Sequence, residues 1–135
     1  MQRLLLALLA TGTAASLAAA CGDSFSPDGL AGTYSLQSVN DEALPATLAE
    51  LGSNKLEAVS GTLVLSGDGT YNLTTHLCTT NSESTSTDTT SDHGDWESEG
   101  TEITLMDSDG GRTLGDVGGA TVTLAMSQVS WLYQR

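Results

Sequence analysis

The chain has 135 residues, with 17 acidic and 4 basic side chains and a formal net charge of −13. Four cations cannot form the basic surface that a phosphate backbone requires, so this balance argues against a nucleic-acid-binding protein. Two cysteines are too few for a disulfide scaffold or a four-cysteine zinc site. The length predicts a single domain.

The first twenty residues have the order of a bacterial secretory signal. Arg3 supplies a positive charge, a leucine-rich apolar run follows, and no further charge appears before Asp23. Three alanines then precede Cys21. This order predicts a cleaved signal peptide over residues 1–20. The alternative, a transmembrane helix, is disfavoured because the second half of the stretch is weakly apolar.

The sequence Ala18-Ala19-Ala20-Cys21-Gly22 resembles the lipobox of bacterial lipoproteins. The resemblance implies that the thiol of Cys21 is acylated, with palmitate or a similar chain, and anchors the protein to a membrane of the cell envelope. Gly22 after the cysteine implies the outer membrane, where the host has one, with the protein facing the periplasm or the cell surface. The alternative is an ordinary cleavage site that leaves Cys21 as a thiol, which could then pair with Cys78. Residues 21–30 are predicted to be a tether.

Beyond the tether, apolar and polar residues alternate, as in strands with one buried and one solvated face. Helical periodicity is nearly absent. The alternating runs cover residues 33–39, 61–66, 70–78, 94–98, 101–106, 121–126 and 129–135. Turns rich in glycine and aspartate are predicted at residues 66–69, 107–111 and 118–119.

This pattern predicts an all-β fold, either an antiparallel barrel or a sandwich. Closing the sheet into a barrel would remove its exposed edges. The alternation assigns thirteen side chains to its interior: Tyr34, Leu36, Leu63, Leu65, Tyr71, Leu73, Trp96, Ile103, Leu105, Val122, Leu124, Trp131 and Tyr133.

Two segments do not follow the pattern. In Leu44 to Leu51, Pro45 could begin and Gly52 could end a helical turn, which competes with a strand. Thr79 to Ser91 consists almost entirely of Ser, Thr, Asn, Asp and Glu. Because it contains no apolar anchor, it is predicted to be a mobile loop.

Several short motifs carry a family resemblance. They are Gly32-Thr33-Tyr34, Gly61-Thr62-Leu63-Val64-Leu65 followed by Asp68-Gly69-Thr70-Tyr71, Gly94-Asp95-Trp96, and the final Trp131-Leu132-Tyr133-Gln134-Arg135. Their order is similar to the lipocalin-like lipoproteins of bacterial envelopes. The resemblance covers residues 31–135 and implies a lipocalin-like domain, a small antiparallel up-and-down β-barrel of about eight strands. It also implies that the first and last strands close the barrel, with Arg135 packed over Tyr34 in place of the family's tryptophan.

Metal and catalytic patterns are weak. His76 and Cys78 share one strand face, and Asp92 and His93 lie further along, but a zinc site needs at least three ligands with supporting contacts. We expect a surface histidine and a lone cysteine instead. The spacing of Asp107, Asp109 and Asp116 misses the calcium-loop pattern and is more typical of a hairpin turn.

The acids Asp95, Glu97 and Glu99 alternate and so predict a solvated strand face rather than a pair of catalytic carboxylates. The chain contains no nucleophile elbow, phosphate loop or dinucleotide fingerprint. We therefore expect no enzymatic activity, no metal and no cofactor.

Two functional hypotheses follow. In the first, the barrel binds a small apolar molecule, with Tyr34, Tyr71, Trp96, Trp131 and Tyr133 as candidate pocket residues. In the second, the acidic surface binds a basic protein such as a lysozyme. An envelope protein with a purely structural role is the third outcome. The short chain predicts a mostly filled barrel with, at most, a shallow apolar pocket near Trp96, Tyr71 or Trp131.

Overall fold

The computed structural model describes residues 27–135, and the predicted signal peptide, Cys21 and the first part of the predicted tether lie outside this range. Within it no helix has the length and apolar character needed to cross a membrane. The elements are helix α1 (Pro27–Leu30) and strands β1 (Gly32–Val39), β2 (Glu42–Ala43), β3 (Ala46–Leu51), β4 (Asn54–Leu65), β5 (Thr70–Thr80), β6 (Thr85–Glu99), β7 (Glu102–Asp107), β8 (Arg112–Gly118), β9 (Thr121–Met126) and β10 (Val129–Gln134).

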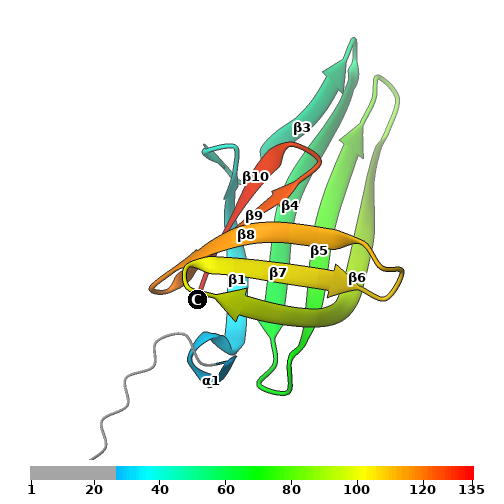
Figure 1. The fold of residues 1–135 in the computed structure, drawn as a ribbon. Helices are drawn as coiled ribbons and strands as arrows, with labels where there is room; N and C mark the ends of the chain where they lie inside the picture. Colours follow the sequence, from blue (N-terminus) through cyan, green and yellow to red (C-terminus); the bar gives the residue numbers. More distant parts are fainter. Residues whose placement is uncertain (1–26) are drawn as a thin grey trace, which may run out of the picture.

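Eight antiparallel strands close into a barrel (Figure 1). From β4 to β10 each strand pairs with the next along the chain, and β1 closes the ring by pairing with β10 on one side and β4 on the other. The predicted all-β, up-and-down barrel is therefore confirmed, as is the pairing of the first and last strands. Closure leaves no free edge along the barrel wall, which removes a site of edge-to-edge aggregation.

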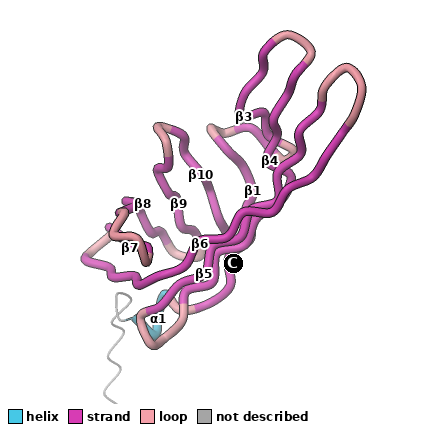
Figure 2. Tube along the Cα trace, turned by 90° about the vertical axis from the view of Figure 1, so that its right-hand side faces the viewer, coloured by secondary structure: helices cyan, strands magenta, loops and turns pink. Residues whose placement is uncertain are grey.

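The two remaining strands, β2 and β3, extend the sheet outside the ring. β2 pairs with the end of β1, and β3 pairs with the first half of β4. The ambiguous segment Leu44 to Leu51 is thus a strand from Ala46 onward. Figure 2 shows that the β3–β4 hairpin and the β5–β6 hairpin extend past the barrel at the same end.

The prediction of a mobile loop over Thr79 to Ser91 is wrong. β5 continues to Thr80 and β6 begins at Thr85, with an unbroken register between them. The connecting turn is held by Asn81, whose Oδ1 accepts the backbone N–H groups of Glu83 and Ser84 at 2.9 and 2.8 Å. The composition indicated correctly that the segment is exposed. It did not decide backbone pairing, which the threonine-rich strands sustain without burial.

Strand β8 is the strand of the closed barrel that the alternation did not identify. Its inward positions are Thr113, Gly115 and Val117, of which only Val117 is a large apolar residue. Gly115 allows close approach to β9, because a Cβ there would overlap the carbonyl oxygen of Thr123. The turn before β8 is as predicted, since Asp107 Oδ1 accepts the N–H groups of two following residues.

The core occupies the barrel interior. All thirteen side chains that the alternation assigned to the interior are buried. The core also includes residues that were not predicted: Leu30, Val39, Ala46, Ala58 and Val117. The pleat of the strands, which sends alternate side chains to opposite faces, accounts for the agreement.

One end of the barrel is closed by α1. Leu30 packs into the core, and the hydroxyl of Tyr34 donates a hydrogen bond of 2.7 Å to its carbonyl oxygen. The guanidinium carbon of Arg135 lies 5.5 Å from the centre of the Tyr34 ring, as predicted. Residues 27–30 of the predicted tether therefore fold onto the barrel. This end is called the capped end below.

Candidate functional site

A cavity of about 300 Å³ opens at the opposite end of the barrel. Trp131, in its wall, pairs with Val39 at the far end of β1 from α1. The lining residues come from β3, β5, β6, β9 and β10: Leu48, Leu73, Thr75, Leu77, Thr90, Ser91, Asp92, Met126 and Trp131. We call this space the mouth cavity.

The long β5–β6 hairpin builds one wall of the mouth cavity. Its inner face carries Leu73, Thr75 and Leu77 on β5, and the register places Asp92, Thr90 and Asp88 opposite them on β6. Threonine side chains are short, so the Thr75–Thr90 pair leaves space where two larger residues would fill the lumen. Tyr34 and Trp96 lie in the capped half of the barrel instead, beside Leu30 and Ser66.

Two buried polar atoms on β10, one of them in the lining of the mouth cavity, find no hydrogen-bond partner within residues 27–135. They are Nε1 of Trp131, which is 8% exposed, and the hydroxyl of Tyr133, which is fully buried. Burial raises the pKa of Tyr133 to about 12. The nearby Thr75 hydroxyl lowers this pKa, although the two hydroxyl groups do not have the geometry of a hydrogen bond. A buried donor without an acceptor costs about 1–3 kcal/mol, so Nε1 of Trp131, which lines the cavity, favours a ligand that supplies an acceptor.

Asp92 is the charged residue that lines the mouth cavity. Its carboxylate is held by two donors: the Tyr71 hydroxyl at 2.7 Å on Oδ2 and the His93 backbone N–H at 2.9 Å on Oδ1. Burial, the hydrogen bond to Asp92 and its negative charge raise the pKa of Tyr71 well above its ordinary value. Tyr71 therefore stays a donor, and the carboxylate is fixed in the cavity wall.

The five aromatic residues predicted as a pocket do not form one site. Trp131 lines the mouth cavity, Tyr133 lies buried close to Thr75, and Tyr71 reaches the cavity only through Asp92. Trp96 and Tyr34 lie toward the capped end, where Trp96 Nε1 donates to the Ser66 carbonyl oxygen at 2.9 Å and the Tyr34 hydroxyl donates to Leu30.

Of the nine residues that line the mouth cavity, only Trp131 was predicted to line a pocket. Leu48 lies in the segment that was left open between helix and strand, while Thr90 and Asp92 lie at the end of the hairpin that was predicted in part as a loop. The one signal that pointed to this wall was the alternation of Leu73 and Leu77.

The structure does not bring the candidate metal residues together, since Asp92 lines the mouth cavity while His76 lies on the outer face of β5. His76 is exposed and its Nδ1 lies 2.9 Å from the Thr89 hydroxyl, while Cys78 forms no disulfide within the described residues. No group of three potential metal ligands gathers anywhere in residues 27–135. Asp95, Glu97 and Glu99 are exposed on the outer face of β6, as predicted.

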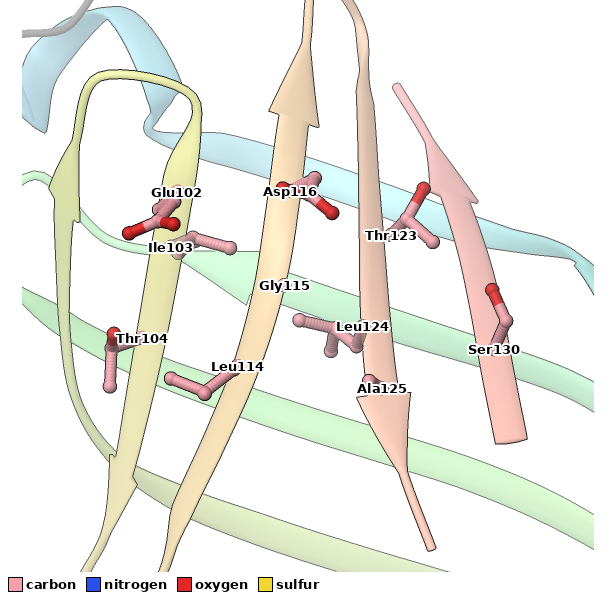
Figure 3. Close-up of a pocket in the computed structure, with 10 residues that line it drawn as sticks. All are labelled: Glu102, Ile103, Thr104, Leu114, Gly115, Asp116, Thr123, Leu124, Ala125 and Ser130. Atoms are coloured by element: carbon pink, nitrogen blue, oxygen red, sulfur yellow. The ribbon is translucent and has the colours of Figure 1, made fainter. Parts of the chain in front are cut away.

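A second hollow, of about 360 Å³, lies on the outer face of β7–β10 (Figure 3). Glu102 and Asp116 line it from adjacent strands, with Thr123 beyond them. The register places Glu99 directly opposite Glu102, and Glu102 directly opposite Asp116. Three carboxylates therefore stand in a row across three strands, an arrangement in which like charges repel. We call this row the acidic row.

Comparisons with known proteins return no match. No protein-family model, no curated protein and no solved structure matches the chain.

Proposed function

We propose that this chain is a lipid-anchored protein of the cell envelope whose barrel binds a small, largely apolar molecule in the mouth cavity. The role is binding rather than catalysis. The observation that carries the proposal is the unpartnered indole N–H of Trp131 beside an apolar cavity.

The lining of the mouth cavity fits such a ligand. Five of the nine lining residues are apolar, and a few polar groups stand among them, which is the usual composition of a small-molecule site. The volume of about 300 Å³ is at the lower end of the range for such sites, so the ligand is small. An acceptor on the ligand would pair with Trp131 Nε1–H and remove the cost of a buried unpaired donor.

The lipid anchor rests on the lipobox-like sequence that ends at Cys21. Five residues lie between Cys21 and Pro27, where α1 begins. A chain segment of this length spans at most about 20 Å even when fully extended. An acylated Cys21 would therefore hold the capped end near the membrane, with the mouth cavity facing away from the lipid.

Binding can be tested with 1-aminoanthracene, an apolar probe whose fluorescence rises in apolar surroundings. We expect saturable enhancement with the unmodified protein and its loss in Met126→Trp, which fills the mouth cavity. Leu51→Trp is the matched control, because Leu51 is 81% exposed at the tip of the β3–β4 hairpin. Enhancement that does not saturate, or that survives in Met126→Trp, would rule out binding in this cavity.

The anchor can be tested by fractionating cells that produce Cys21→Ser. We expect the native protein to require detergent for extraction and the variant to be uncleaved or soluble. A processed variant that still fractionates with membranes like the native protein would contradict the lipid anchor.

A second candidate function is binding of a basic protein partner, such as a lysozyme, through the acidic row. The observation that favours it is the direct opposition of Glu99, Glu102 and Asp116, since a cationic partner would relieve their repulsion. Calorimetry with a basic lysozyme should then give binding that weakens with salt and is lost in Glu102→Gln/Asp116→Asn. Asp109→Asn/Asp95→Asn removes the same charge away from the row and should bind normally. Equal loss in both variants would leave only a non-specific effect of net charge.

A further inference from the structure

The chemistry of the mouth cavity points to the charge of its ligand. Asp92 is the charged residue in its lining, and Asp88, on the same inner face of β6, lies opposite the lining residue Leu77. No cation of residues 27–135 lines the cavity. Lys55 is paired with Glu57 at 2.5 Å on β4, and Arg135 lies over Tyr34 at the capped end.

The Asp92 carboxylate is half-buried and has capacity for a further donor. Each carboxylate oxygen accepts one hydrogen bond from the protein, on Oδ2 from Tyr71 and on Oδ1 from His93. A carboxylate oxygen can accept two, so a donor from a ligand can be added without displacing either. A hydrogen bond between an ammonium group and a carboxylate is shorter and stronger than one between neutral groups.

The remaining lining suits the apolar part of the same molecule. Leu48, Leu77 and Met126 offer hydrocarbon contact, and the indole of Trp131 can contact either an alkyl chain or a cation. A carboxylate ligand would meet the opposite situation, because it would place a second negative charge beside Asp92 with no lining cation to compensate.

We propose that the mouth cavity selects a small, largely apolar amine, with its ammonium group on Asp92, its hydrocarbon part against Leu77 and Met126, and an acceptor elsewhere in the molecule, such as a hydroxyl or ether oxygen, on Trp131 Nε1–H. This inference rests on the proposed binding function and specifies the ligand class. It excludes fatty acids as the preferred ligands.

The test uses three probes with the same chain and different head groups: octylamine, octanoate and 1-octanol. Binding to the full-length protein is measured by calorimetry and by tryptophan fluorescence at neutral pH and moderate salt. We expect octylamine to bind at least about tenfold more tightly than octanoate, as a charge-assisted contact predicts.

Two variants locate the effect. Asp92→Asn keeps an acceptor for Tyr71 and removes the charge, so the preference for octylamine should fall to less than about threefold while 1-octanol binds as before. Asp95→Asn removes the same charge from the exposed outer face of the same strand and should keep the preference.

The outcomes separate the two proposals. Octanoate binding as tightly as octylamine would overturn the amine proposal and leave the binding function standing. A preference that persists in Asp92→Asn, or disappears equally in Asp95→Asn, would overturn the role of Asp92, because it would then reflect the net charge of the protein. Failure of all three probes, 1-octanol included, would overturn the binding function itself.

Discussion

Replacing Tyr133 with phenylalanine should stabilise the barrel. The side chain is fully buried and its hydroxyl has no hydrogen-bond partner in the described part of the chain. An unpaired buried hydroxyl costs about 1–3 kcal/mol, and Tyr133→Phe removes it while keeping the ring. We expect a gain of about 1 kcal/mol in the free energy of unfolding at pH 7, which raises Tm by about 4 °C or more for a domain of this size.

The same substitution should reduce the loss of stability at high pH. Burial raises the pKa of Tyr133 to about 12, against an ordinary value of 10.0. Below pH 10 both the folded and the unfolded state keep the proton, so this group adds no pH dependence. Between pH 10 and 12 the unfolded state loses a proton that the folded state retains, which lowers stability by about 2.7 kcal/mol. Tyr34 and Tyr71, whose pKa values burial also raises, remain in the variant, so the decline should be smaller but not absent.

The assay is urea unfolding, followed by tryptophan fluorescence, at pH 7 and in steps from pH 9 to 12. Tyr34→Phe is the control, and it should lower the free energy of unfolding at pH 7. The Tyr34 hydroxyl donates a hydrogen bond to Leu30, and its removal leaves that buried carbonyl oxygen unpaired. If Tyr133→Phe loses more than about 1 kcal/mol at pH 7, the hydroxyl has a partner and our interpretation of the mouth cavity is wrong. An unchanged slope above pH 10 would refute the raised pKa.

Two further substitutions test the barrel itself. Gly94→Ala should destabilise by about 3 kcal/mol or more, because a Cβ there overlaps a main-chain carbonyl oxygen of β7, whereas Gly118→Ala, with its nearest neighbour at 3.5 Å, should have little effect in the same urea titration. Equal effects of the two would contradict the close approach of β6 and β7. Arg135→Ala should lose about 1 kcal/mol through its contact with Tyr34, and Arg112→Ala, which removes the same charge at an exposed site, should lose less. If Arg135→Ala and Arg112→Ala lower the free energy of unfolding equally, the cation–π contact contributes nothing to stability.

The sequence alone was sufficient for the barrel and its interior. Alternation predicted inward positions such as Leu63, Tyr71 and Leu124, and all of them are buried, because the strand pleat sends neighbouring residues to opposite faces. The resemblance to lipocalin-like lipoproteins implied the contact between Arg135 and Tyr34, which the structure contains. Alternation is a local pattern, and the pleat of a strand preserves it in the folded barrel.

Other features were decided by tertiary pairing. β8 carries small inward residues around Gly115, so its identity as a strand comes from its hydrogen bonds to β7 and β9 rather than from its side chains. The extension of β5 and β6 likewise depends on backbone pairing that composition does not record. A segment without apolar residues can therefore be ordered when its neighbour is already a strand.

The mouth cavity also could not be predicted from the sequence. Leu48, Asp92 and Trp131 come from three separate segments, and only closure of the barrel brings them to one end. The sequence also cannot show that Trp131 Nε1 lacks a hydrogen-bond partner, because a hydrogen bond depends on the distance and direction between atoms far apart in the chain. Local alternation determined which side chains point inward, whereas the lengths and register of the paired strands determined where the interior stays unfilled.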